Sequence, residues 1–287
     1  MNKLICSIGE VLWDVYPKCK TPGGAPANFA YHTIQNNHRA ILVSSVGDDN
    51  NGNELLAFLQ AKGIHTEYIQ ISDKYPTGTV QVSISEGIPN YNIYENTAWD
   101  NIVISEKLLE LAQSADAICF GTLASRNSIS QNTICSFLDS SSKSCLKILD
   151  VNLRQQYYSK ELLEEYLSRA DILKINDEEL DIIAELFNLQ GDEAVIIETL
   201  RTTFAIKAVL LTLGAQGAIY YAENEKYHCS AVKNIDVVST VGCGDSFTAA
   251  FVCHYLNGAT PQEAIDQAAK TASFVAQKAD AMPDYSD

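Results

Sequence analysis

The sequence predicts an α/β fold in which helices flank a doubly wound, mainly parallel β-sheet. Short apolar runs alternate with segments of helical period through most of the 287 residues, as they do in β-α-β units. Hydrophobic residues make up 46% of the chain and charged residues 20%, which is typical of a globular protein with a sizeable core. We expect one domain over residues 1–287, because no linker, repeat or low-complexity segment divides the chain.

Six short apolar runs are the predicted strands of this sheet. Helices between most of them make the connections long enough for parallel pairing on both faces. The predicted strands are 4–8, 40–46, 117–120, 147–150, 172–175 and 208–213. The predicted helices are 26–36, 53–61, 106–113, 160–168, 177–186, 192–203, 243–256 and 261–277.

Two further stretches alternate with period two and interrupt this pattern. One is 11–16, and the other is a hairpin of 79–85 and 90–94 that turns at 86–89. We expect them to form a small separate β-layer from roughly 11–18 and 78–97.

Charge and cysteine content exclude several classes of protein. The chain has 36 Asp and Glu against 20 Lys and Arg, a formal charge of -16, which would repel nucleic acid or an anionic membrane surface. Its eight cysteines contain no Cys-x-x-Cys pair and no zinc-ligand spacing, so we interpret them as reduced thiols. No apolar run is long enough for a signal peptide or a membrane span. These features predict a cytoplasmic protein with small-molecule ligands.

The strongest candidate site is the run Gly242-Cys243-Gly244-Asp245, where a predicted helix begins. The glycines let backbone N–H groups converge, and the helix N-terminus adds partial positive charge, so the turn could hold a phosphate group. Asp245 could then accept the proton of an attacking hydroxyl group. The alternative is a tight turn in which Asp245 only favours the helix dipole.

A second candidate lies near the N-terminus, where Gly23 and Gly24 precede Pro26 and Asn28. Proline suits the first turn of a helix, and the Asn28 amide can both donate to and accept from a polyol. The alternative is a glycine turn at a helix start. Asp14, on the alternating stretch 11–16, is a weaker candidate with an ordinary surface explanation.

The third candidate is Asn176 with Glu179, directly after a predicted strand. This spacing is a helix-capping pattern, and the same carboxylates at a strand's carboxyl end could also organise Mg²⁺ through its waters. Both interpretations can hold at once.

Two common nucleotide-binding motifs are absent from the sequence. There is no Gly-Lys dipeptide, hence no Walker A loop, and no G-x-G-x-x-G. Weaker polar groups follow other strands, and each also has an ordinary turn explanation: Arg154 after 147–150, and Thr212, Gly214 and Gly217 after 208–213.

Five motifs, taken in order, resemble the ribokinase-type carbohydrate kinase family, also called the phosphofructokinase-B family. The resemblance spans almost the whole chain, and the fructokinase branch is most similar through Gly9-Glu10-x-Leu12-x-Asp14 and the stretch 95–100 (Glu-Asn-Thr-Ala-Trp-Asp). The five motifs are Gly-Gly-Ala-Pro-Ala-Asn (23–28), Val-Gly-Asp-Asp (46–49), Asp-x-Asn-x-Arg (150–154), Asn-x-x-Glu (176–179) and Gly-Cys-Gly-Asp (242–245).

This resemblance implies a ribokinase-like fold and ATP-dependent transfer of a phosphoryl group to a hydroxyl group of a small sugar, with D-fructose as the expected substrate. It implies that the small β-layer closes over the sugar as a lid and excludes water. The family pattern makes Asp245 the base, with the amides of Gly242, Cys243 and Gly244 as the anion hole. It assigns Asp14, Gly24, Asn28 and Arg154 to the sugar and the transferred phosphoryl group, Asn176, Thr212, Gly214 and Gly217 to the nucleotide, and Glu179 to Mg²⁺ through water.

Two positions depart from the family pattern. Ser239 stands where the family commonly has an Asp of a monovalent-cation site, so dependence on K⁺ is in doubt. Cys243 stands where Ala is usual, and its backbone N–H is kept. The helix N-terminus would lower the pKa of the Cys243 thiol, whereas the carboxylate of Asp245 would oppose this. If the helix terminus dominates, Cys243 should be a reactive thiol that ATP protects.

Two alternatives to a sugar kinase stay open: a nucleoside kinase of the same fold, and a non-catalytic sugar-binding regulator. Asp14 with Asn28 favours a polyol over a base, and Asp245 with its two glycines favours catalysis. The hairpin 79–94 is expected to leave an edge strand, which proteins usually cover, so we also expect a homodimer paired through the lid.

Overall fold

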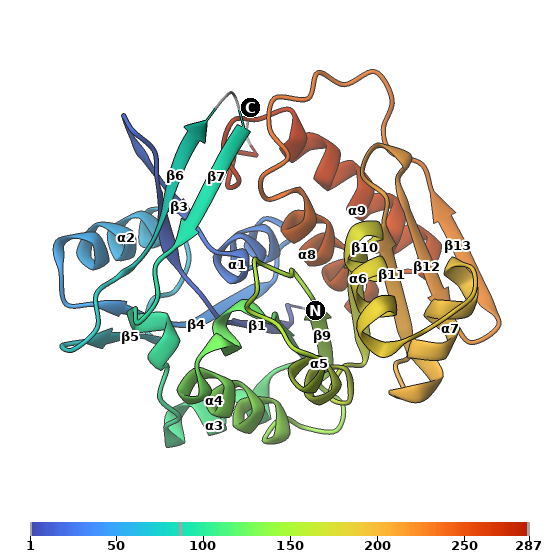
Figure 1. Cartoon of the computed structure of the whole chain (residues 1–287), viewed down its shortest axis with the longest axis horizontal. Helices are drawn as coiled ribbons and strands as arrows, with labels where there is room; N and C mark the ends of the chain where they lie inside the picture. Colours follow the sequence, from blue (N-terminus) through green and yellow to red (C-terminus); the bar gives the residue numbers. More distant parts are fainter. Residues whose placement is uncertain (1, 86–87, 286–287) are drawn as a thin grey trace.

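In the computed structural model, which describes residues 2–85 and 88–285, a large twisted sheet lies between two layers of helices (Figure 1). The six predicted strands are all present, and their neighbours pair in parallel. Only the pairs made by β12 are antiparallel in this sheet. Within the described residues the sheet has nine strands, in the order β13 (Glu225–Cys229), β12 (Ala218–Ala222), β11 (Ala208–Thr212), β10 (Ile172–Asn176), β9 (Leu146–Asp150), β8 (Ala117–Phe120), β1 (Leu4–Ile8), β4 (Arg39–Gly47) and β5 (Ile69–Ser72).

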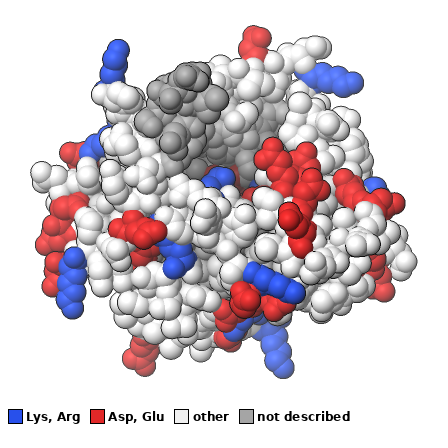
Figure 2. Space-filling model, in the orientation of Figure 1, with Lys and Arg blue, Asp and Glu red and all other residues white. Residues whose placement is uncertain are grey.

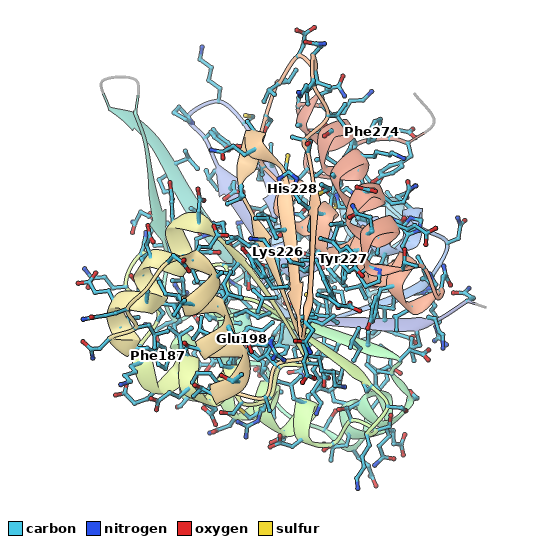
Figure 3. The ribbon with its side chains drawn as sticks, turned by 90° about the vertical axis from the view of Figure 1, so that its right-hand side faces the viewer. Phe187, Glu198, Lys226, Tyr227, His228 and Phe274 are labelled. Carbon is cyan, nitrogen blue, oxygen red and sulfur yellow. The ribbon has the colours of Figure 1, made fainter. Side chains whose placement is uncertain are left out.

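Helices cover both faces of this sheet, as the alternation of strands and helices predicts. Figure 3 views the molecule toward Tyr227 of β13, with Phe187 and Glu198 on one side of the strands and Phe274 on the other. One apolar cluster joins the sheet to α3 (Glu106–Ser114), α4 (Ser128–Asp139), α5 (Lys160–Leu167), α6 (Asp177–Phe187) and α7 (Glu193–Thr203). Clusters on the other face include α1 (Ala25–Gln35), α2 (Asn50–Ala61), α8 (Cys243–Leu256) and α9 (Pro261–Ala276).

The apolar side chains of β1 show how one strand serves both layers. Successive side chains of a strand point to opposite faces. Cys6 and Ile8 therefore pack into the first cluster, while Ile5 packs into the second. All three are buried. A strand buried on both faces has a continuous apolar run, and for this reason the runs were visible in the sequence.

A small second sheet stands at the carboxyl ends of the parallel strands, as expected from the stretches with period two (Figure 1). Residues 86 and 87 of the predicted hairpin turn lie outside the described residues, and Ile88 and Pro89 belong to a strand rather than to the turn. The order of this sheet is β3 (Lys20–Gly23), β2 (Leu12–Val15), β6 (Gly78–Ser85) and β7 (Ile88–Ile93), with β2 and β6 parallel and the outer pairs antiparallel.

The sequence analysis did not predict several of the helices and strands. The helix α4 contains Ser, Asn and Thr residues, which are weak helix formers, and it is stabilised by packing and by the Asn127 cap. The strands β3, β5, β12 and β13 were also missed. The β12–β13 pair turns around Asn224 at φ 59° rather than at an Asn-Gly pair. Three short 3₁₀ segments complete the chain: Ala98–Asn101, Leu123–Arg126 and Gly214–Gln216.

Candidate active site

The carboxyl ends of β1, β9, β10 and β11, the first turn of α8 and the small sheet surround one large cavity of about 1860 Å³. This volume exceeds the roughly 300–1,000 Å³ of a typical small-ligand site, so the cavity has room for two ligands. Every candidate residue from the sequence lines it: Asp14, Gly24, Asn28, Arg154, Asn176, Glu179, Thr212, Gly214, Gly217, Gly242, Cys243, Gly244 and Asp245.

Asp245 lines this cavity from the first turn of α8. Its Oδ2 atom accepts a hydrogen bond of 2.7 Å from Nδ2 of Asn28, which is 217 residues away in the chain. Asn28 is buried in the first turn of α1, and its Oδ1 atom has no hydrogen-bond partner among the described residues. A buried acceptor without a donor is costly, so this oxygen is suited to accept a ligand hydroxyl group.

Burial gives the carboxyl groups of this cavity unusual acidities. It raises the pKa of Asp245 to about 6, helped by the negative charge of Asp150, while Asn28, Lys174 and Arg154 act in the opposite direction. Burial also raises the pKa of Glu10 to about 7. A carboxylate with a pKa near 6 is ionised at neutral pH and is a stronger base than an ordinary Asp, which suits it to accept a proton.

The backbone around Gly242 forms the turn that precedes α8. Gly242 has φ 79°, and a Cβ atom on it would lie 2.7 Å from Cβ of Ala281. Only glycine fits this combination of left-handed backbone and close approach. The N–H of Cys243 donates to the carbonyl oxygen of Thr240 at 3.3 Å, and the N–H of Ser246 donates to that of Gly242 at 2.9 Å. The N–H groups of Gly244 and Asp245 lie between these two in the first turn of α8, where a helix leaves N–H groups available to an anion.

Asp14 and Arg154 are two charged side chains that line the same cavity. Asp14 is on β2 opposite Thr21 of β3, so the small sheet carries it over the site. Burial raises the pKa of Asp14 to about 6, and the positive charge of Arg154 opposes this. Arg154 also lowers the pKa of Glu10 and of Asp245, which places one guanidinium group within electrostatic reach of all three carboxyl groups.

The part of the cavity around Gly214 and Gly217 is built from small residues. At Gly217, φ is 100° and a Cβ atom would lie 2.0 Å from the carbonyl oxygen of Cys229, so the turn after β11 requires glycine. Gly214 is also left-handed, with open space around it. Ala269, Ala272 and Ala276 of α9 line the same region and leave room for a flat ring, and the sequence analysis missed them because alanines on a helix carry no chemical signal.

The capping role of Asn176 and Glu179 is confirmed. Asn176 accepts from the N–H of Glu179, and Glu179 accepts from the N–H groups of Asn176 and Leu153, at 2.8, 3.0 and 3.0 Å. Glu179 is buried but lines the cavity. In the part of the chain that the structure describes, no group of three or more His, Cys, Asp or Glu side chains could hold a metal ion. This donor set fits Mg²⁺ held through water and not through direct ligation.

The expectation of a reactive Cys243 thiol is wrong. Burial, together with the negative charge of Asp245, raises the pKa of the Cys243 thiol to about 11. The thiol lies 3.8 Å from the carbonyl oxygen of Ser239, in the wall of the turn. Burial outweighs the helix terminus, because a thiolate would lose its hydration there beside a carboxylate.

Two residues that line the cavity, Glu10 and Lys174, and Asp150 beside it had no role assigned from the sequence alone. Glu10 is buried and accepts from the N–H of Ala25 at 3.3 Å. Asp150 and Lys174 form a buried ion pair beneath the α8 turn, with 3.0 Å between Oδ1 and Nζ. For Asp150 and Lys174, a charged residue in an otherwise apolar strand was the signal that could have indicated them.

Acidic side chains lie beside the hollow in the face shown in Figure 2, in keeping with the formal charge of -16. The cavity itself contains basic residues, among them Arg154 and Lys174, whose positive charge could attract an anionic ligand. Among the described residues, no helix is both long enough and apolar enough to cross a membrane.

The mainly parallel sheet, the small second sheet and the cavity between them define a ribokinase-like kinase. The sequence profile named "pfkB family carbohydrate kinase" matches residues 3–287, and the chain belongs to this family. A protein of Arabidopsis thaliana named "Probable fructokinase-3" is 29% identical over 270 residues, which cover 87% of this chain and 76% of that protein.

Solved structures show the same fold. An uncharacterized sugar kinase from Pyrococcus horikoshii in complex with ATP has a TM-score of 0.83 at 26% identity, over 97% of this chain and 94% of that one. A fructokinase from Vibrio cholerae O395 with fructose, ADP and calcium bound has a TM-score of 0.81 at 23% identity, over 98% and 94% of the two chains. The ribokinase-like fold and the recognition of a carbohydrate kinase family from the sequence are thus both confirmed.

Proposed function

We propose that this carbohydrate kinase transfers the γ-phosphoryl group of ATP to a hydroxyl group of D-fructose, with Asp245 as the general base. The observation that carries the proposal is the contact between Asp245 and Asn28, because it joins the anion-binding turn to the sugar side of the cavity. The identity to relatives named fructokinase supports fructose, and the complex of the similar sugar kinase supports ATP.

In this proposal each group of the chain has one task. Asn28, Gly24 and Asp14 hold the sugar so that its hydroxyl group meets the Asp245 carboxylate, which takes the proton as the oxygen attacks phosphorus. The N–H groups of Gly242, Cys243 and Gly244 receive the charge that develops on the transferred phosphoryl group. Arg154 adds positive charge nearby. Mg²⁺, held through water at Glu179, would neutralise charge on the ATP phosphates.

The remaining tasks belong to the nucleotide and to the small sheet. Asn176, Thr212, Gly214 and Gly217 line the nucleotide side, where the cavity is open and its residues are small. The small sheet acts as a lid, since it carries Asp14 over the cavity and can exclude water when the sugar is bound.

A coupled assay of ADP release over ketoses, aldoses and nucleosides tests this function. We expect the highest kcat/KM with fructose. A nucleoside as the preferred acceptor would identify the nucleoside kinase alternative, and binding of a sugar by calorimetry without ADP release would identify a non-catalytic regulator. A polyol is favoured because Asp14, Asn28 and Arg154 offer charged and hydrogen-bonding groups where a base would need an apolar slot.

Glu179→Gln is expected to raise the Mg²⁺ concentration needed for half-maximal activity about 10-fold, the effect typical of a lost outer-shell partner. The amide keeps an oxygen that can accept one of the two capping bonds, so the melting temperature should change little. Glu263→Gln is a matched control, because Glu263 forms a capping box with Thr260 away from the cavity. If both variants lose only thermal stability and their Mg²⁺ titrations match the parent, Glu179 is solely a cap.

We expect K⁺ to have little or no effect on the rate. Ser239 offers one uncharged hydroxyl oxygen, which already accepts from the N–H of Val241 at 3.2 Å. Such an oxygen is a poorer cation ligand than a carboxylate. Initial rates in KCl and in NaCl at equal ionic strength should agree within about two-fold, the size of a general salt effect. A several-fold activation by K⁺ would show that other atoms form a cation site.

We also expect a homodimer paired through the small sheet. Strands β3 and β7 lie at the edges of this sheet among the described residues, and an uncovered edge invites pairing with a second chain. Light scattering at micromolar concentration should give twice the chain mass of 31.5 kDa. A mass of one chain would contradict this arrangement.

A further inference from the structure

A chain of buried contacts connects Lys174 with the helix that carries Asp245. Lys174 of β10 and Asp150 of β9 are register partners in the sheet, so their side chains point to the same face. Nζ of Lys174 lies 3.0 Å from Oδ1 of Asp150, and each side chain is only 9% exposed. The other oxygen, Oδ2, lies 3.0 Å from Oγ1 of Thr248, which is fully buried on α8.

Thr248 connects this ion pair to the first turn of α8. Its hydroxyl group also lies 2.9 Å from the carbonyl oxygen of Gly244. The hydroxyl has one proton to donate, and the charged Asp150 is the stronger acceptor. Lys174 also lies next to this turn: a Cβ atom added to Gly244 would lie 3.2 Å from Nζ of Lys174.

We propose that Lys174 is a positioning residue for the catalytic base: through Asp150 and Thr248 it holds the first turn of α8 in place, with its ammonium group next to Gly244 of that turn. This inference rests on the proposed role of Asp245 as the base. A buried ion pair on its own is weak grounds for a role in stability, because desolvation offsets its attraction. This pair instead lies against the first turns of α8, where it contacts Thr248 and approaches Gly244, the residue before Asp245, and this position points to function.

The charges around Asp245 come from every element packed against it. Asp150 raises the pKa of Asp245, whereas Lys174, Arg154 and the hydrogen bond from Asn28 lower it. Glu10 of the segment after β1 also interacts electrostatically with Asp245.

Two further groups lie near these charges. On β8, burial raises the pKa of the Cys119 thiol, so this thiol is neutral. Glu179 is in electrostatic reach of Lys174. Lys174 thus offsets a buried group of negative charges that would otherwise favour protonated Asp245.

The sign of each charge gives a test that does not depend on enzyme activity. The titration of Asp245 can be followed by NMR in protein labelled with ¹³C at the Asp carboxyl carbons, with the signal assigned by its loss in Asp245→Asn. Lys174→Met should move the midpoint of Asp245 to higher pH, and Asp150→Asn should move it to lower pH. The double variant should titrate between the two single variants, because the two charges have opposite effects.

Thr248→Val tests the positioning of the α8 turn separately from the charge of Lys174, because it removes the hydroxyl group and keeps every ionised group. We expect kcat to fall about 10-fold, the equivalent of one hydrogen bond to a charged group, with KM for the sugar and the Asp245 midpoint unchanged. Thr33→Val is the matched control: Thr33 is equally buried, and its hydroxyl group bonds to the carbonyl oxygen of Phe29 within α1 and to the Cys253 thiol, outside the cavity lining. It should leave kcat unchanged.

The proposal is overturned if the Asp245 midpoint is the same in Lys174→Met as in the parent, or if Thr248→Val and Thr33→Val have equal kcat. If Lys174→Met does not fold, the Thr248→Val comparison decides alone. Failure of the proposed function is a different result: the parent chain would release no ADP with any sugar, while the midpoints of Asp245 would still shift in the stated directions.

Discussion

Asp245→Asn is expected to reduce kcat by about 10²–10⁴, the usual contribution of a general base. The asparagine has nearly the same shape and can still bond to Asn28, but it cannot take a proton from the sugar hydroxyl group. The KM for the sugar and the affinity for ATP, measured by calorimetry, should change little, because the anion-binding turn is intact. A kcat of Asp245→Asn within about 10-fold of the parent would show that Asp245 is not the general base.

The pH profile provides an independent check on this prediction. The pKa of Asp245 is raised to about 6, so the base is ionised above that pH and activity should fall as the pH drops through it. Asp245→Asn should lack this acid limb. Asp139→Asn is the matched control, since Asp139 is an exposed residue paired with Arg169 and should keep both the rate and the limb.

Gly242→Ala is expected to have the second largest effect, with kcat reduced by about 10²–10³, as when a donor of an anion hole is lost. The new Cβ atom would lie 2.7 Å from Cβ of Ala281 and would place alanine at φ 79°. Ala281 cannot easily move, because its carbonyl oxygen accepts from Nε2 of His32 at 2.9 Å. The turn must therefore shift, and its N–H groups with it. We also expect a loss of about 1–3 kcal/mol in the free energy of unfolding.

Gly258→Ala separates the strain of the left-handed backbone from the effect on the site. Gly258 has φ 89° at the end of α8, and a Cβ atom there would meet nothing within 4 Å. We expect it to lower stability by about 1 kcal/mol and to leave kcat unchanged. Equal losses of kcat in the two variants, measured at the same folded fraction, would show that Gly242 has no particular role in the anion hole.

Local features of this fold could be predicted from the sequence alone. The strands β1, β8 and β10 are mostly apolar because both of their faces are buried, although Ser7 interrupts β1 and Lys174 interrupts β10, and an apolar run of this kind is visible without knowing its neighbours. Helix starts could also be predicted, because the residues that form them are close together in the sequence. Pro26, and the Asn176 cap with Glu179, act within one turn of their own helix.

The order and spacing of five motifs were likewise sufficient to identify the family and its fold, and the thirteen candidate residues do line one cavity. A glycine turn at a helix start has the same local chemistry in any fold. The turn at Gly242 became specific for this family only through its order and separation along the chain from Gly24 and Asn28.

Only the tertiary structure decided which side chains share an environment. Asn28 reaches Asp245 across 217 residues, and the ion pair of Lys174 with Asp150 exists because β9 and β10 are neighbours in the sheet. The raised pKa of Cys243 has the same origin, since its thiol is buried beside Asp245. Burial and charge act over a few ångströms in space, so these properties follow from the packing of distant segments, whereas strands, caps and glycine turns follow from their own residues.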